Sequence, residues 1–307
     1  MSKIKLTLLW VLCSTFLAFG SYTYGAGKIN VVTTTTDLAN LVKVVGGEKV
    51  NLVSLSTGSQ DPHFVEPRPS MVIQLKNADM LVKMGMDLDM WIDGLIAAAR
   101  NSKIIYGAKG YVDTSVGIER LEVRKGKIDG SMGDIHIYGN PHYQTDPASA
   151  KPMTKNILDG LCRIAPKDSE YFKHNRDEYL KKLEERMVLW NREMARFEGS
   201  NIVTYHNSWP YLARRFGLNV VGHVEPKPGI PPSPAHLASL INLMKEKKVK
   251  VILVEPYFPL KGPMMLAEKT GAKVLTLPPS VGGVKEVRTY LELFEYNINQ
   301  LVKALAE

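Results

Sequence analysis

The first part of the chain alternates between short β-branched runs and segments whose apolar residues lie three or four positions apart. The β-branched runs at 29–34 and 50–55 predict short strands. Between them, apolar residues three or four positions apart follow Asp37 and stop at a glycine pair, which predicts a helix that Asp37 caps. A helix at 70–77 and a strand at 80–85 continue the pattern. Such alternation predicts a parallel sheet covered by helices.

The last third of the chain shows the same alternation. A stretch dense in proline, residues 226–234, predicts an irregular loop within it. The predicted strands are 201–205, 218–221, 250–254 and 273–277, and the predicted helices are 209–216, 234–247 and 285–306. We therefore expect a second α/β unit built like the first.

The two units are separated by a long segment without proline or glycine. From Asp168 to Glu198 the chain is rich in Glu, Lys, Arg and Leu, and its large apolar residues fall on one helical face. A helix of this length would extend for roughly 45 Å, more than one small domain needs. It predicts a rigid connector between two lobes; a long surface helix of a single domain is the alternative.

The first residues have the order of a secretory signal peptide. Lys3 and Lys5 precede an apolar stretch at 6–19, and small residues follow up to Ala26. We expect residues 1–26 to be removed and the protein to be periplasmic. A lipid anchor on Cys13 is poorly supported, because Leu12 precedes it where a lipoprotein signal has a small residue. Cys162 would then be the only cysteine, so no internal disulfide is expected.

Length and charge bound the remaining possibilities. About 280 residues allow two lobes and a cleft, and we place the N-terminal lobe at 27–166, the connecting helix at 167–198 and the C-terminal lobe at 199–307. The net charge of +8 falls to +6 without the two leader lysines. The excess is spread over the chain rather than gathered in a basic tract, so nucleic-acid binding finds no support.

Three histidines stand in separate segments flanked by proline or aromatic residues: His63, His142 and His206. Three neutral imidazoles are the usual protein share of an open zinc site. His136 lies shortly before His142 and is a further candidate for binding or capturing metal. The other three histidines, His174, His223 and His236, lack such a context and are expected to be surface or hydrogen-bonded residues.

The segments around these histidines resemble a known family. Residues 61–69, Asp-Pro-His-Phe-Val-Glu-Pro-Arg-Pro, are similar to the D-P-H-x-x-E-P-x-P motif of the periplasmic zinc and manganese solute-binding proteins of ABC transporters. Residues 140–147 resemble the family's D-P-H-x-W-x-D-P, with Asn140 and Gln144 as departures. Residues 205–212 and 254–258 resemble its third histidine element and its E-P-Q-F segment. The similar segments follow the family's order along the chain.

The resemblance implies two α/β lobes joined by one long helix, with the metal in the cleft and His63, His142 and His206 as ligands. The family's fourth ligand is usually an aspartate, but Pro278 stands in that place here. The fourth position is therefore open, held by water, or reached by Glu255 or His136. Glu255 ends a buried strand, where open α/β sheets place ligand groups; its alternative role is to bond loop amides and hold the lobes together.

The donor types favour zinc as the metal. Imidazole suits zinc, whereas manganese prefers more carboxylate oxygen and is the less favoured ion. The predicted function is capture of a divalent transition metal and its delivery to an ABC permease, with contact to the membrane only through that permease or an anchor. A zinc-dependent hydrolase is disfavoured because no H-E-x-x-H motif is present. A surface adhesin of the same family is the other alternative.

Overall fold

The first sheet has four parallel strands. The computed structural model describes residues 27–123 and 136–306, so the signal-peptide prediction lies outside the described residues. The strand order is β2-β1-β3-β4. The bounds are β1 Ile29–Thr33, β2 Val50–Ser54, β3 Met80–Lys83 and β4 Tyr111–Asp113. Every neighbouring pair is parallel.

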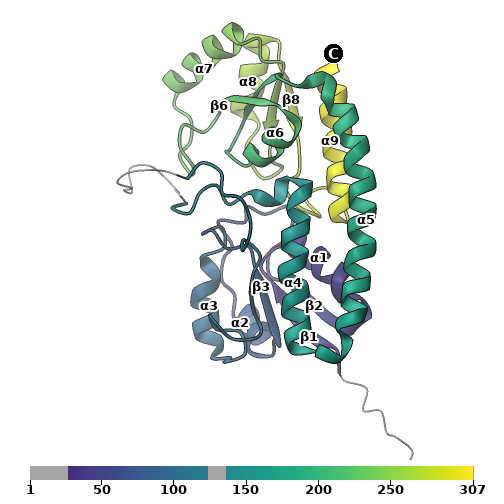
Figure 1. Cartoon of the computed structure of the whole chain (residues 1–307). Helices are drawn as coiled ribbons and strands as arrows, with labels where there is room; N and C mark the ends of the chain where they lie inside the picture. The colour runs from purple at the N-terminus through teal and green to yellow at the C-terminus, as the bar shows by residue number, and fades with distance from the viewer. Residues whose placement is uncertain (1–26, 124–135, 307) are drawn as a thin grey trace, which may run out of the picture.

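The second sheet repeats this arrangement. Its order is β6-β5-β7-β8, again with only parallel pairs. The bounds are β5 Asn201–Thr204, β6 Asn219–His223, β7 Val251–Val254 and β8 Lys273–Thr276. In both sheets the strand that comes first in sequence lies between the second and the third. The predicted fold class, two parallel-sheet α/β lobes, is confirmed (Figure 1).

Helices lie around the two sheets. They are α1 Thr36–Gly46, α2 Pro69–Lys76, α3 Trp91–Ala99, α4 Ala150–Ile164, α6 Pro210–Phe216, α7 Pro234–Glu246, α8 Lys261–Thr270 and α9 Tyr290–Ala306. The sequence did not predict α3, α4, α8 or β4. It also began α9 five residues too early, at 285. In the described residues no helix has both the length and the apolar composition needed to cross a bilayer.

The cap of α1 differs from the prediction. Thr35, not Asp37, is the N-cap, and its side chain accepts a hydrogen bond from the amide of Leu38. Asp37 lies in the first turn with its side chain buried, and Oδ1 accepts from the amide of Val281 (2.8 Å). A threonine cap satisfies the same free amides as an aspartate cap, so the local pattern did not distinguish them.

The connector is α5, Ser169–Met194, flanked by single 3₁₀ turns. Its 26 residues extend for about 39 Å. α5 packs against α1 and α4 at one end and against α9 at the other, so it runs beside both lobes (Figure 1). The predicted apolar face is buried at Phe172, Tyr179, Leu183, Trp190, Met194 and Phe197. The connecting-helix prediction is confirmed.

One hydrophobic core reaches through both lobes. It includes Val31 and Leu38 near the first sheet, Ile202 and Leu253 in the second, and the buried face of α5 between them. A smaller cluster lies on the other face of each sheet. The lobes are therefore joined along the α5 side, and the loops at the carboxyl ends of the strands meet away from it.

Candidate metal centre

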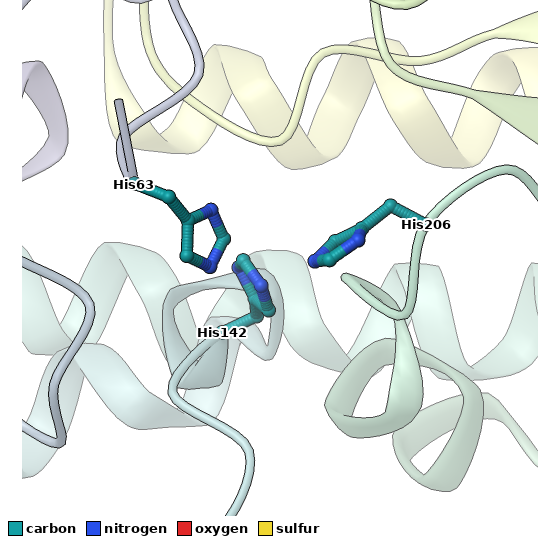
Figure 2. A group of neighbouring side chains, drawn as sticks. All are labelled: His63, His142 and His206. Carbon is teal, nitrogen blue, oxygen red and sulfur yellow. The ribbon is translucent and has the colours of Figure 1, made fainter. Parts of the chain in front are cut away.

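Three imidazoles meet between the lobes. His63 lies on the loop after β2, His142 on the segment that follows β4, and His206 directly after β5. One donor atom of each histidine lies within 4.8 Å of those of the other two. Figure 2 shows the three rings converging from separate loops. His63 and His206 lie on loops after the carboxyl ends of β2 and β5, where open α/β sheets place ligand groups, whereas His142 lies 29 residues after β4, before the turns that lead to α4.

His63 is held by its own turn. Oδ1 of Asp61 accepts from the His63 amide (3.0 Å) and lies 2.8 Å from Nδ1 of the ring. Nε1 of Trp91 donates to the carbonyl of Pro62 (3.0 Å), which anchors the turn to α3. Burial opposes ionisation of Asp61, but the hydrogen bond and charge of His63 hold the pKa of this carboxyl below its usual value. The contact leaves Nε2 of His63 as the donor toward the cluster.

His206 has an equivalent partner in the second lobe. Its Nδ1 lies 2.7 Å from Oε2 of Glu225, and both side chains are buried. Burial lowers the pKa of His206, but the hydrogen bond to Glu225 and the charges of Glu255, Glu225 and Asp61 together outweigh it, so the pKa is raised. Sequence reasoning missed Glu225. A signal existed, because Glu225-Pro226 follows β6 as Glu255-Pro256 follows β7.

His142 is the most isolated of the three rings. Its exposed fraction is 2%, and neither ring nitrogen has a hydrogen-bond partner among the described residues. Burial and the charges of His63 and His206 hold its pKa well below the ordinary value, so the ring is neutral. Buried polar atoms without partners are rare and require an explanation. A cation held between this ring and the other two imidazoles would give one of its nitrogens a partner.

His136 approaches the same group. Its Nε2 lies 3.1 Å from Nε2 of His63, and the two ring centroids are 5.1 Å apart. Burial and the charge of His63 lower the pKa of His136 to about 3, which keeps this ring neutral as well. Four ligands at about 2.0–2.1 Å from a tetrahedral zinc ion lie roughly 3.3 Å apart. The separation of the two nitrogens is close to that value.

Glu255 lies outside the group of three histidines. It is fully buried after β7, and its Oε1 accepts from Nε1 of Trp209 (3.0 Å). Burial raises its pKa to about 7. The hydrogen bond ties the end of β7 to the start of α6, which is a role within the C-terminal lobe. Pro278 likewise contributes to structure there, since its carbonyl accepts from Nδ2 of Asn297 (2.8 Å).

A cavity of about 460 Å³ opens onto the histidines. Its lining includes Glu122, His136, His142, His206 and His223. His223 is hydrogen-bonded as expected, with Nδ1 2.8 Å from Oγ1 of Thr204. The cavity is large enough to admit a hydrated cation and lined by groups that attract one.

Comparison with known proteins agrees with this arrangement. The family model described as zinc-uptake complex component A, periplasmic, matches residues 31–304. The high-affinity zinc uptake system protein ZnuA of Bacillus subtilis is 27% identical over 305 residues, which cover 97% of this chain and 94% of that protein.

Two solved structures share the fold. A crystal structure of ZnuA superposes with a TM-score of 0.77 at 22% identity, covering 91% of this chain and 99% of that one. The laminin-binding adhesin Lmb from Streptococcus agalactiae, a mutant structure, has a TM-score of 0.77 at 26% identity, covering 90% and 99%. Both likenesses extend over the two lobes and the connecting helix.

Proposed function

Because the chain belongs to the ZnuA family of periplasmic zinc-uptake components, we propose that it binds zinc through His63, His142 and His206 and delivers the ion to an ABC permease. The observation that carries the site is the buried His142 ring. Its two nitrogens lack partners in the described part of the chain, and it stands within 4.8 Å of donors from the other two histidines. The zinc ion is cargo rather than a resident cofactor.

Two carboxylates orient the outer rings for this task. Asp61 and Glu225 accept from Nδ1 of His63 and His206 respectively, which leaves Nε2 of each ring free to bind metal. Such partners fix the tautomer and increase the basicity of a ligating imidazole. The carboxylates contribute negative charge close to the cation without being ligands themselves.

For the fourth position we favour His136 over Glu255. Nε2 of His136 is already at nearly the spacing of two zinc ligands from His63, whereas Oε1 of Glu255 is bound to Trp209 and Glu255 does not belong to the three-histidine group. A set of imidazole nitrogens favours zinc over manganese, because manganese prefers hard carboxylate oxygen. The proposed selectivity for zinc follows from that donor set.

The cellular role follows from the family. Zinc capture outside the cytoplasm requires export, which agrees with the predicted leader at 1–26. The likeness to a laminin-binding adhesin is one of fold. Deleting the gene and restoring it with wild-type or H142A protein separates the roles: a transport protein restores growth in zinc-depleted medium only as wild type, whereas an adhesin restores attachment to laminin with either.

A ligand series tests the site itself. His63, His142 and His206 are each changed to alanine, and zinc affinity is measured by competition with a chromogenic chelator. Loss of a ligand should weaken binding by at least about 10-fold, the effect known for lost supporting partners of metal ligands. H174A is the matched control, since His174 is exposed on α5. Unchanged affinity in all three variants would overturn the site.

Two further variants, H136A and E255Q, decide which group holds the fourth position. H136A should weaken zinc binding, and E255Q, which keeps the acceptor for Trp209, should change it by less than H136A does. A strong loss in E255Q with an unchanged H136A would assign Glu255 instead. No loss in either variant would assign the position to water.

A further inference from the structure

Glu122 has an unusual backbone close to the site. Its φ is 56°, in the left-handed region that residues other than glycine adopt rarely. Its side chain reaches the cavity beside the histidines. Oε2 accepts from Nδ2 of Asn140 (3.0 Å) and from Nδ2 of Asn207 (2.7 Å). One carboxylate oxygen therefore receives two side-chain amides from different segments.

The two asparagines belong to the histidine loops. Oδ1 of Asn140 accepts from the His142 amide (3.0 Å), and Nδ2 of Asn140 also donates to the carbonyl of Asn207 (2.9 Å). Asn207 directly follows His206. Since Asn140 meets one donor and two acceptors, its amide orientation is determined by its partners. Glu122 and the two asparagines thus form a bridge between the loop of His142 and the loop of His206.

The segment that carries Glu122 is itself held in place. Oη of Tyr211, a buried residue of α6, accepts from the amide of Leu121 (3.2 Å) and lies 3.1 Å from the carbonyl of Glu119. The carbonyl of Leu121 accepts from the amide of Asn140 (2.8 Å). A Cβ on Gly139 would lie 2.6 Å from that carbonyl, so the close approach requires glycine. These contacts fix the carboxylate at the point where the loops meet.

We propose that Glu122 is a positioning residue of the metal site, whose carboxylate joins the loops of His142 and His206 through Asn140 and Asn207. The inference rests on the proposed function. It also accounts for asparagine at position 140, where the similar motif has aspartate. A carboxylate there would face the Glu122 oxygen and the Asn207 carbonyl at the present 3.0 and 2.9 Å, and three acceptors without a donor repel one another.

The first test removes the carboxylate. E122A should weaken zinc binding about 10-fold, as loss of a partner outside the ligand shell does. It should also change the visible absorption of the cobalt-substituted protein, because that spectrum reports the ligand geometry. E119A is the matched control: the Glu119 side chain is exposed and pairs with Arg214 rather than with a histidine loop. An E122A variant that binds like E119A would overturn the proposal.

The second test exchanges charges, so that rescue rather than loss is measured. N140D should weaken zinc binding at least as much as E122A. In the N140D/E122Q double variant the glutamine amide donates to the new carboxylate, so part of the lost affinity should return, while the Asn207 carbonyl still faces that carboxylate. Glutamine alone keeps an acceptor and should cost less than E122A. If the double variant binds no better than N140D, the bridge does not position the loops.

Two controls keep the outcomes distinct. Thermal unfolding of each metal-free variant identifies any that has lost the fold. The zinc affinities are then compared only among the folded variants. If H142A leaves zinc binding unchanged, the proposed site fails whatever Glu122 does. If H142A abolishes binding while E122A and N140D leave both affinity and spectrum unchanged, only the role of Glu122 fails.

Discussion

Asp37 illustrates how one residue can make the stability of this protein depend on pH. The carboxyl is buried, and burial raises its pKa from 3.8 to about 6 despite the hydrogen bond from the Val281 amide. The folded protein therefore retains a proton that the unfolded chain releases at lower pH. The associated stability is fully present below about pH 3.8 and is lost as the pH rises through about 6.

Replacing Asp37 by asparagine should remove this dependence. Between pH 4 and pH 7 the wild type should lose up to about 3 kcal/mol of unfolding free energy relative to D37N, since the shift is about two pK units. Urea unfolding of metal-free protein at several pH values measures the difference. D177N changes an exposed carboxyl and serves as the control. Parallel pH profiles for wild type and D37N would contradict the prediction.

At the scale of elements, α1 and the loop before His63 both contact the segment that leads from β8 into α9. Oγ1 of Thr36, at the start of α1, donates to the carbonyl of Val281 (2.6 Å), and Oδ1 of Asn40 accepts from the amide of Tyr290 (2.9 Å). Gly58 lies against the same segment, where an added Cβ would collide with the backbone of Val281, Gly282 and Gly283. The loop before His63 therefore packs backbone to backbone against the C-terminal part of the chain.

Alanine at Gly58 should separate these two loops. Overpacking costs about 1–3 kcal/mol, and here the colliding atoms are backbone, so G58A should destabilise the protein by an amount in that range. G94A is the matched control, because a Cβ at this position of α3 meets nothing within 4 Å and alanine favours a helix. Thermal unfolding compares the two. Equal melting temperatures would show that the loop moves freely.

The whole molecule combines two sheets with one continuous core. Residues from β1, α5, β7 and α9 belong to the same buried cluster, so the largest core is shared by both lobes, and each lobe adds a smaller cluster of its own. The proposed ligands come from both lobes, His63 and His142 from one and His206 from the other. Zinc would therefore connect lobes that already share their packing on the side of α5.

Unfolding should accordingly be a single cooperative transition, with and without metal. Free zinc at 100 times its dissociation constant should stabilise the native state by about 2.7 kcal/mol, because the ion binds the assembled site. Calorimetry of the wild type and H142A measures both effects, and H142A should gain much less. Two separate transitions in the metal-free protein would contradict a shared core.

The parts that were predicted correctly rest on local chemistry. Short β-branched or apolar runs identify most strands, and the 3.6-residue period identifies the connector, because both signals are contained in a local segment. The proline- or aromatic-flanked motifs of His63, His142 and His206 mark them in the sequence, and the structure brings the three together, while their binding of metal stays a prediction. The helices α3 and α4 carried similar apolar spacing, at Ile92, Leu95 and Ile96 and at Met153, Ile157 and Leu161, but their signals were missed.

The sequence by itself determined the class of fold and the three histidines proposed as ligands, since the strands, the helices and the histidine motifs are each local patterns of neighbouring residues. Only the tertiary structure decided which groups surround them. Glu225 beside His206, His136 beside His63 and Glu122 between two asparagines are contacts between residues 19, 73 and 18 to 85 positions apart. No local pattern encodes such distances, because the path of the chain through both lobes sets them.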